Sequence, residues 1–187
     1  MEKKGRNRVE PLRHLADIQR IKGNLKAQSL RDYALFVLGL NTGLRESDLL
    51  KLKLEDVLNE EGHFKHHISI RQTKTNHLIR PFINCAMREA LTHYLRSKDF
   101  KPEDRLFDIS PVRFHQLIKK WVKDVGLDPS EISTHSLRKS FGYHLYMKGT
   151  AIELVAYALG HKDTKTTMLY IGLSQDQCWK AQAELNL

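Results

Sequence analysis

The chain has 187 residues, of which 41% are hydrophobic and 28% are charged. These proportions are ordinary for one soluble globular domain, and they exclude a disordered or fibrous protein. No apolar run approaches the length that spans a membrane, and the polar first residues have no apolar segment behind them, so we expect a cytoplasmic protein.

The charge balance favours a polyanionic partner. Thirty-one Lys and Arg residues against 22 Asp and Glu residues leave a net charge of +9. Such an excess steers the association of a polyanion such as nucleic acid. On its own, however, the charge fits a solvated basic surface equally well.

Cysteine and histidine spacing gives no sign of a metal site. Cys85 and Cys178 form no CxxC motif, so we expect two free thiols. His63, His66 and His67 lie close together, but no carboxylate or cysteine stands at ligand spacing from them.

Helical periodicity begins after a polar, basic lead-in of residues 1–13, which we interpret as a mobile terminus or a linker remnant. Ser29 and Asp32 resemble a capping box that opens a second helix, and this helix is predicted to end near Gly43. The apolar positions of the first helix recur at helical spacing, at Leu15, Ile18, Ile21 and Leu25.

A short helix and a hairpin are predicted next. The helix covers residues 45–52, so its first residue, an arginine, lies at a turn entering a helix. Alternation over residues 64–71 and an extended run over residues 78–83 predict a β-hairpin with Lys74 near its tip. Pro81 indicates that the second strand lies at a sheet edge.

Helices and loops make up the rest of the chain. Ser110 and Pro111 are typical of a helix start, and Gly149 and Gly160 of helix ends. The sequence therefore predicts a mainly helical α+β domain with one small antiparallel sheet. The later helices are expected at about 85–97, 111–125, 135–148, 151–158 and 164–171.

Five basic side chains, followed along the chain by a tyrosine, form a series suited to attack by the tyrosine on a phosphate. A phenol with a reference pKa of about 10 is only about one part in a thousand ionised at pH 7, so a nucleophilic tyrosine needs bases and cations nearby. This series offers both, and it points to DNA strand cleavage and rejoining through a phosphotyrosine. The six residues are Arg45, Lys74, His135, Arg138, His161 and Tyr170.

Each residue alone also has an ordinary structural interpretation. Tyr170 could be a core aromatic on a helix face, His135 a helix cap, and His161 a loop histidine after a glycine stop. The two arginines could form ion pairs with Asp48 or Glu153. The hairpin lysine could simply be a solvated tip.

Taken in order, the motifs resemble those of the tyrosine recombinases, the phage integrase family. The family's Thr-Gly-Leu-Arg box appears at residues 42–45, and the acidic residue three positions on, most often Glu, is Asp48 here. Its His-x-Leu-Arg box appears at residues 135–138, and its Leu-Gly-His and Thr-x-x-Tyr elements lie within residues 159–170. The family's hairpin lysine falls on Lys74. These boxes together are highly specific.

The resemblance implies a site-specific DNA recombinase that forms a 3′-phosphotyrosine intermediate. The two arginines and His161 would contact the scissile phosphate. His135 would act as general base for Tyr170, and Lys74 would protonate the departing 5′ oxygen. No metal or other cofactor is implied. The expected partner is double-stranded DNA at specific sites, where a protein that is monomeric in isolation would assemble as a tetramer on paired sites.

Two other functions stay open. An enzyme with the same chemistry could relax supercoils like a type IB topoisomerase, rejoining the original strand. Alternatively, the domain could bind DNA without catalysis, although the intact series argues against this. The resemblance further implies a bacterial or phage-encoded protein.

The expected catalytic domain covers residues 14–187, after the lead-in of residues 1–13. The N-terminal helical domain that helps clamp DNA in longer family members is not in this sequence, so the chain is either an excised domain or a naturally short member. Residues 174–187 are predicted to form a helix, because Ser174 and Gln177 resemble a capping box. That helix would dock on a neighbouring protomer or fold back on its own domain.

Overall fold

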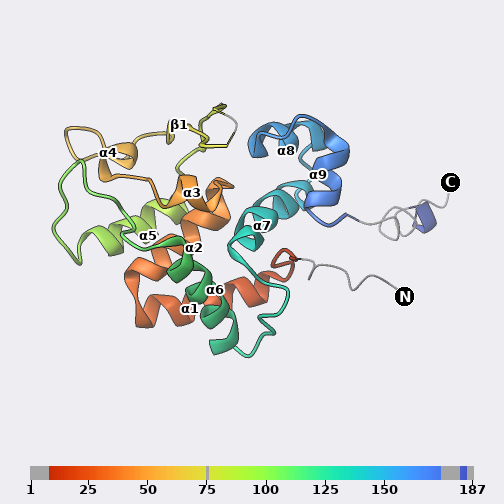
Figure 1. Ribbon diagram of the computed structural model, residues 1–187, viewed down its shortest axis with the longest axis horizontal. Coiled ribbons are helices and arrows are strands. Elements are labelled where there is room, and N and C mark those ends of the chain that lie inside the picture. The colour runs from red at the N-terminus through yellow and green to blue at the C-terminus, as the bar shows by residue number, and fades with distance from the viewer. Residues whose placement is uncertain (1–8, 75, 174–181, 185–187) are drawn as a thin grey trace.

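The computed structural model describes residues 9–74, 76–173 and 182–184. Within these residues the chain forms a helical body with one small antiparallel sheet (Figure 1), which confirms the predicted fold class. The elements are α1 (Leu15–Gln28), α2 (Leu30–Thr42), α3 (Glu46–Leu49), α4 (Leu54–Val57), β1 (Ile70–Arg71), β2 (Leu78–Ile79), α5 (Cys85–Leu95), α6 (Pro111–Asp124), α7 (Thr134–Met147), α8 (Ile152–Leu159) and α9 (Thr164–Tyr170).

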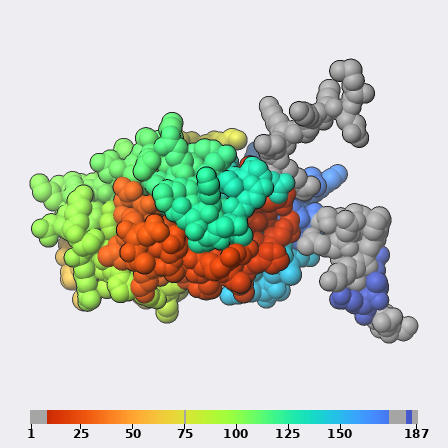
Figure 2. Space-filling view, turned by 90° about the horizontal axis from the view of Figure 1, so that it is seen from below, coloured from red at the N-terminus to blue at the C-terminus, as the bar shows by residue number. Residues whose placement is uncertain are grey.

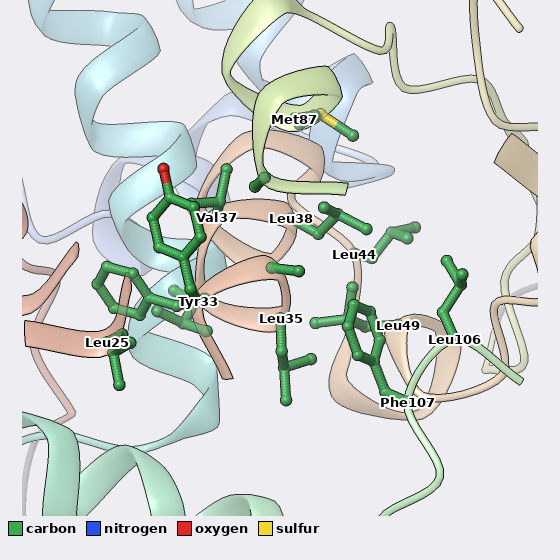
Figure 3. Packing of buried hydrophobic residues seen from close by; sticks show 14 of the residues in the cluster. Leu25, Tyr33, Leu35, Val37, Leu38, Leu44, Leu49, Met87, Leu106 and Phe107 are labelled. Atoms are coloured by element: carbon green, nitrogen blue, oxygen red, sulfur yellow. The ribbon is translucent and has the colours of Figure 1, made fainter. Parts of the chain in front are cut away.

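Helix α2 forms the centre of the main core. Helices α1, α5 and α7 all pack against it, and residues 33–38 of α2 are buried without a break. A helix that is apolar all round belongs in a protein interior. Figure 3 shows Tyr33 and Leu35 of α2 surrounded by side chains such as Leu25 of α1 and Met87 of α5. Helices α1 and α6 lie side by side on one face of this core (Figure 2).

The predicted end of α2 is confirmed and has a steric cause. Gly43 has a φ of +62°, the left-handed conformation that favours glycine at a helix end. A Cβ atom built there would lie 2.4 Å from Cδ1 of Phe141, a residue of α7. Glycine therefore permits the turn after α2 to pack directly against α7, and Arg45 follows two residues later.

Several other predicted helix boundaries are also confirmed by their capping bonds. The hydroxyl of Ser29 accepts a hydrogen bond from the backbone N–H of Asp32 at the start of α2. Ser110 caps α6, which begins at Pro111, and Gly160 ends α8. The predicted helix over residues 45–52 is shorter in the structure, however, and the sequence patterns do not predict the separate helix α4.

The hairpin is also shorter than predicted. Strands β1 and β2 pair over only two residues each, and one isolated bridge, His67 to Phe82, continues the pairing. Between these points the carbonyl of Pro81 accepts a hydrogen bond from the backbone N–H of Ile68, with an N···O distance of 2.9 Å. Proline has no N–H to return, so the ladder is interrupted there.

A second, smaller core lies where α7, α8 and α9 meet. Its fully buried members are Val155, Leu159 and Ile171. In Figure 1, α8 and α9 lie on the side of α7 away from α5, and α7 joins them to the main body. Arg138 and Tyr170 come from this part of the molecule. The predicted C-terminal helix falls mostly outside the described residues.

Candidate active site

Ends and turns of helices bring most of the predicted site residues together. Arg45 is the residue before α3, His161 follows the end of α8, and Tyr170 is the last residue of α9. His135 and Arg138 lie one turn apart on α7. Lys74 lies in the turn between β1 and β2.

Arg138 links three of the sequence motifs. The residue is 2% exposed, and its guanidinium donates hydrogen bonds to the backbone carbonyls of Gly43 and Leu159. These bonds fix the planar group between the turn after α2 and the end of α8. Burial lowers the pKa of Arg138, while the nearby Tyr170 opposes this shift.

Arg45 presents a buried donor with no protein acceptor. Its Nη1 atom is shielded from solvent and has no hydrogen-bond partner among the described residues. The charge of Arg45 also lowers the pKa of Arg138, so two guanidinium groups are held close together. An unpaired buried donor costs free energy, and so does the proximity of like charges. An anion between the two groups would offset both costs.

Tyr170 lies next to both Arg138 and His161. Its ring packs edge-on against the imidazole of His161, with the ring centroids 4.9 Å apart. Burial raises the pKa of Tyr170, whereas Arg138 lowers it as a charge and as a hydrogen-bond donor, and Arg45 lowers it as a charge. The phenol is therefore half-buried beside two cations, with burial as the larger effect.

His161 is neutral at pH 7 in this environment. Burial lowers its pKa to about 4, and the charges of Arg138 and Arg45 act in the same direction. Its Nδ1 atom lies 3.0 Å from Oγ1 of Thr167, a fully buried residue of α9. This contact fixes the ring relative to the helix that carries the tyrosine.

His135 does not cap its helix, so that alternative interpretation is wrong. Ser133 caps α7, and His135 is the second helical residue. The residue as a whole is exposed to solvent, but its imidazole is partly surrounded by protein, and this partial burial lowers the pKa of His135. The carboxylate of Glu46 opposes the shift. Glu46 also accepts a hydrogen bond of 2.6 Å from the hydroxyl of Thr134, which ties α3 to the start of α7.

Lys74 stands apart from the other five residues. It is exposed in the turn, and among the described residues no contact joins it to the rest of the site. The preceding residue is firmly held, because Oδ1 of Asp48 accepts hydrogen bonds from the N–H and the hydroxyl of Thr73 at 2.9 and 2.7 Å. Asp48 thus anchors the base of the turn that carries Lys74.

Sequence reasoning missed a second contact that holds the hairpin. Gln72 is 1% exposed, and its side chain packs against Gly160, the residue before His161. A Cβ atom at Gly160 would lie 3.0 Å from Oε1 of Gln72, and the φ of +62° there also favours glycine. No pattern in the sequence singles out Gln72, because its partner lies far along the chain.

Two further features considered from the sequence were ion pairs of the two arginines and a histidine cluster. Within the described residues, neither arginine forms an ion pair with Asp48 or Glu153. In the same part of the chain, no three His, Cys, Asp or Glu side chains gather in a way that could hold a metal ion. None of the described helices is long and apolar enough to cross a membrane.

Comparisons with known proteins identify the family of this chain. The model of the phage integrase family matches residues 11–177. A protein of Bacillus subtilis (strain 168) named "Probable integrase/recombinase YoeC" is 34% identical over 175 residues, covering 90% of this chain and 92% of that protein. The tyrosine recombinase XerA of Saccharolobus solfataricus is 30% identical over 169 residues. The chain therefore belongs to the phage integrase family, the tyrosine recombinases.

Solved structures show the same fold. The crystal structure of a XerA recombinase covers 100% of this chain with a TM-score of 0.76 and 22% identity, and this chain covers 67% of that protein. A structure of the XerH site-specific recombinase bound to its difH substrate covers 97% of this chain with a TM-score of 0.70 and 21% identity. The chain spans almost all of YoeC but only 55% of the S. solfataricus XerA.

Proposed function

We propose that this protein cleaves and rejoins DNA strands at specific sites through a covalent bond between Tyr170 and a 3′ phosphate. One observation carries the proposal: a buried, unpartnered donor of Arg45 lies with Arg138 beside the phenol of Tyr170. Two guanidinium groups near a nucleophile suit a phosphodiester, whose non-bridging oxygens gain negative charge during transfer.

The bonds and protons of the proposed step are all accounted for by the protein and the DNA. The Tyr170 oxygen bonds to phosphorus, the bond from phosphorus to the 5′ oxygen breaks, and the energy of the phosphodiester is kept in the phosphotyrosine. His135 accepts the phenol proton, and Lys74 gives a proton to the 5′ oxygen. A 5′ hydroxyl, from the same or a partner strand, then reverses the reaction.

The perturbed pKa values favour these assignments. His135 has a lowered pKa, so at pH 7 its imidazole is mostly the neutral form that can accept a proton. The raised pKa of Tyr170 keeps the phenol protonated until a base acts on it. Because burial makes proton loss harder, attack by the phenol depends on a base and on the opposing charges of Arg138 and Arg45. His161, also neutral, would donate one hydrogen bond to the phosphate.

The proposed partner is double-stranded DNA, with assembly of the monomer into a tetramer on paired sites. The net charge of +9 supports a polyanionic partner. Two solved structures with the same fold support a DNA partner: one is XerH bound to its difH substrate, and the other is a lambda integrase dimer bound to a core site. Residues 14–187 would serve as the catalytic domain, in the cytoplasm of a bacterium or a phage host.

The proposed function can be tested by capturing DNA that becomes covalently attached to the protein. The target sequence need not be known in advance. The protein is incubated with a pool of nicked duplexes of randomised sequence, and DNA that stays attached in detergent is recovered and sequenced. We expect attached DNA with a shared motif from the natural protein, and none from Tyr170→Phe, which removes only the nucleophilic oxygen. Equal attachment by the Phe variant would refute the assignment of the nucleophile.

Two further results would identify the alternative functions. Relaxation of supercoiled plasmid without any exchange between two captured sites would identify a topoisomerase-like enzyme. Binding of DNA without covalent attachment by the natural protein would identify a non-catalytic DNA-binding module.

A further inference from the structure

Residues 9–14, which precede α1, are bound along α7 and are called the entry strap here. The backbone N–H of Leu12 donates to the hydroxyl of Ser140 at 2.7 Å, and the carbonyl of Leu12 lies 2.8 Å from Nε2 of His144. Leu12 itself is 5% exposed and belongs to the main core. The entry strap is therefore a fixed part of the fold, although it forms no helix or strand, and the prediction of a mobile lead-in or linker remnant is wrong for residues 9–13.

One side chain of α7 connects the entry strap to the nucleophile. The ammonium group of Lys139 donates a hydrogen bond of 2.7 Å to the carbonyl of Val9. The same Nζ atom lies 5.3 Å from the centre of the Tyr170 ring, within the range of a cation–π contact. Since Lys139 follows Arg138 directly, the residue that lowers the pKa of the phenol and the residue that contacts its ring are adjacent on one helix.

A second contact reaches the turn that follows the nucleophile. Arg13 donates a hydrogen bond of 3.0 Å to the carbonyl of Gly172, two residues after Tyr170. Arg13 is itself held by an ion pair with Glu10 at 2.9 Å and by the ring of Tyr143 at 4.9 Å. The entry strap thus contacts the ring of the nucleophile through Lys139 and the backbone behind it through Arg13.

We propose that Lys139 is a positioning residue for Tyr170, and that the entry strap holds Lys139 in place. This proposal rests on the proposed function, because it concerns the orientation of the same nucleophile. Covalent attack needs the phenol oxygen in line with the leaving group, and small errors of placement cost rate. The ring already meets His161 edge-on, and the ammonium of Lys139 restrains it further.

The variants separate positioning from loss of charge. Lys139→Met keeps a long apolar side chain but removes the charge and the donor. Lys139→Arg keeps both and should rescue. Lys148→Met removes one positive charge from an exposed site at the end of the same helix, so it controls for weaker attraction of DNA.

Single-turnover attachment is measured at saturating DNA with a duplex recovered in the covalent capture. We expect Lys139→Met to form the adduct about fivefold to tenfold more slowly than Lys148→Met, while both bind DNA with the same affinity. Lys139→Arg should recover most of the rate. Equal rates for the two Met variants, or an affinity loss that accounts for the whole effect, would overturn the proposal.

A measurement without DNA keeps this test separate from the proposed function. The protein is labelled with 3-fluorotyrosine, and the signal of residue 170 is assigned from its loss in Tyr170→Phe. Lys139→Met and Arg13→Ala should shift that fluorine signal, and Lys148→Met should not. An unchanged signal in both Lys139→Met and Arg13→Ala would refute the contact, whatever the protein does to DNA.

Discussion

The carboxylate of Asp48 binds Thr73 twice, through the backbone N–H and through the hydroxyl. This relationship joins the short helix after Arg45 to the turn that carries Lys74. The aspartate is 1% exposed and Thr73 is exposed, so the acceptor end of both bonds is shielded from water.

We expect Asp48→Ala to impair cleavage by loosening the hairpin turn. Thr73 would lose both bonds, and a displaced Lys74 would protonate the leaving oxygen less often, with a loss of about tenfold to a hundredfold. Asp48→Asn, which keeps one acceptor oxygen, should retain more activity than Asp48→Ala. Adduct formation in a single turnover measures both, and an Ala variant as active as the natural protein would show that the anchor is dispensable.

A substrate with sulfur in place of the 5′ bridging oxygen tests the role of Lys74. A thiolate leaves without a proton, so this substrate should restore cleavage by Lys74→Ala. The same substrate should also partly rescue Asp48→Ala, because that variant acts through the lysine. Failure to rescue Lys74→Ala would mean that the lysine is not the acid and serves the phosphate or the solvent instead.

Arg138→Lys should be a poor substitute for the natural residue. The guanidinium donates to Gly43 and Leu159 with two different nitrogens, and one ammonium cannot reproduce both bonds while facing a phosphate. We expect cleavage to fall by about 10² to 10⁵, by analogy with oxyanion donors and arginine fingers. Arg113→Lys, on the exposed side of α6, is the matched control and should cleave normally.

The hydroxyl of Thr167 is expected to set the tautomer of His161. It has one proton and lies 3.0 Å from both Nδ1 of His161 and the carbonyl of Asp163. Neutral His161 can donate from Nε2 to a phosphate only if Nδ1 carries no proton, and a threonine proton directed at Nδ1 rather than at the carbonyl of Asp163 favours that tautomer. Thr167→Val should therefore slow cleavage about tenfold and Thr167→Ser should not. Nitrogen chemical shifts of His161 report the tautomer, and a Val variant with natural shifts and rate would contradict this role.

Stability should decline at acid pH partly through His161. Its pKa is about 4 in the folded protein and near 6.5 when exposed, so the unfolded chain binds the proton more readily. The stabilisation is complete above about pH 6.5 and is lost as the pH falls toward 4. Urea unfolding should show a shallower decline over this range for His161→Gln than for the natural protein or His115→Gln, and equal slopes would argue against a depressed pKa.

Local signals explain why the helices can be predicted. The caps at Ser29 and Ser110 and the stops at Gly43 and Gly160 act within a few residues, so they can be recognised in the sequence. The hairpin is predicted too long because alternation alone ignores the missing N–H of Pro81. Its strands pair only briefly as a result.

The site follows from the ordered motifs, but its supports do not. The order of the arginines, histidines and tyrosine along the chain is enough to indicate phosphate chemistry, and no distances between them are needed. By contrast, the bonds of Arg138 to two carbonyls and the packing of Gln72 on Gly160 join residues distant in sequence. One sequence gives no pairing information of that kind.

The small core under α8 and α9 has a consequence for how the nucleophile can move. Among the residues that the structure describes, Val155, Leu159 and Ile171 are the fully buried members of this core, so their unit has much less apolar area to lose than the core around α2. Regions with few buried contacts open at lower free energy than the whole domain unfolds. Amide hydrogens of α9 should therefore exchange with solvent faster than those of α2. In the proposed reaction, Tyr170 could then withdraw from the phosphate while Arg138 on α7 stays in place.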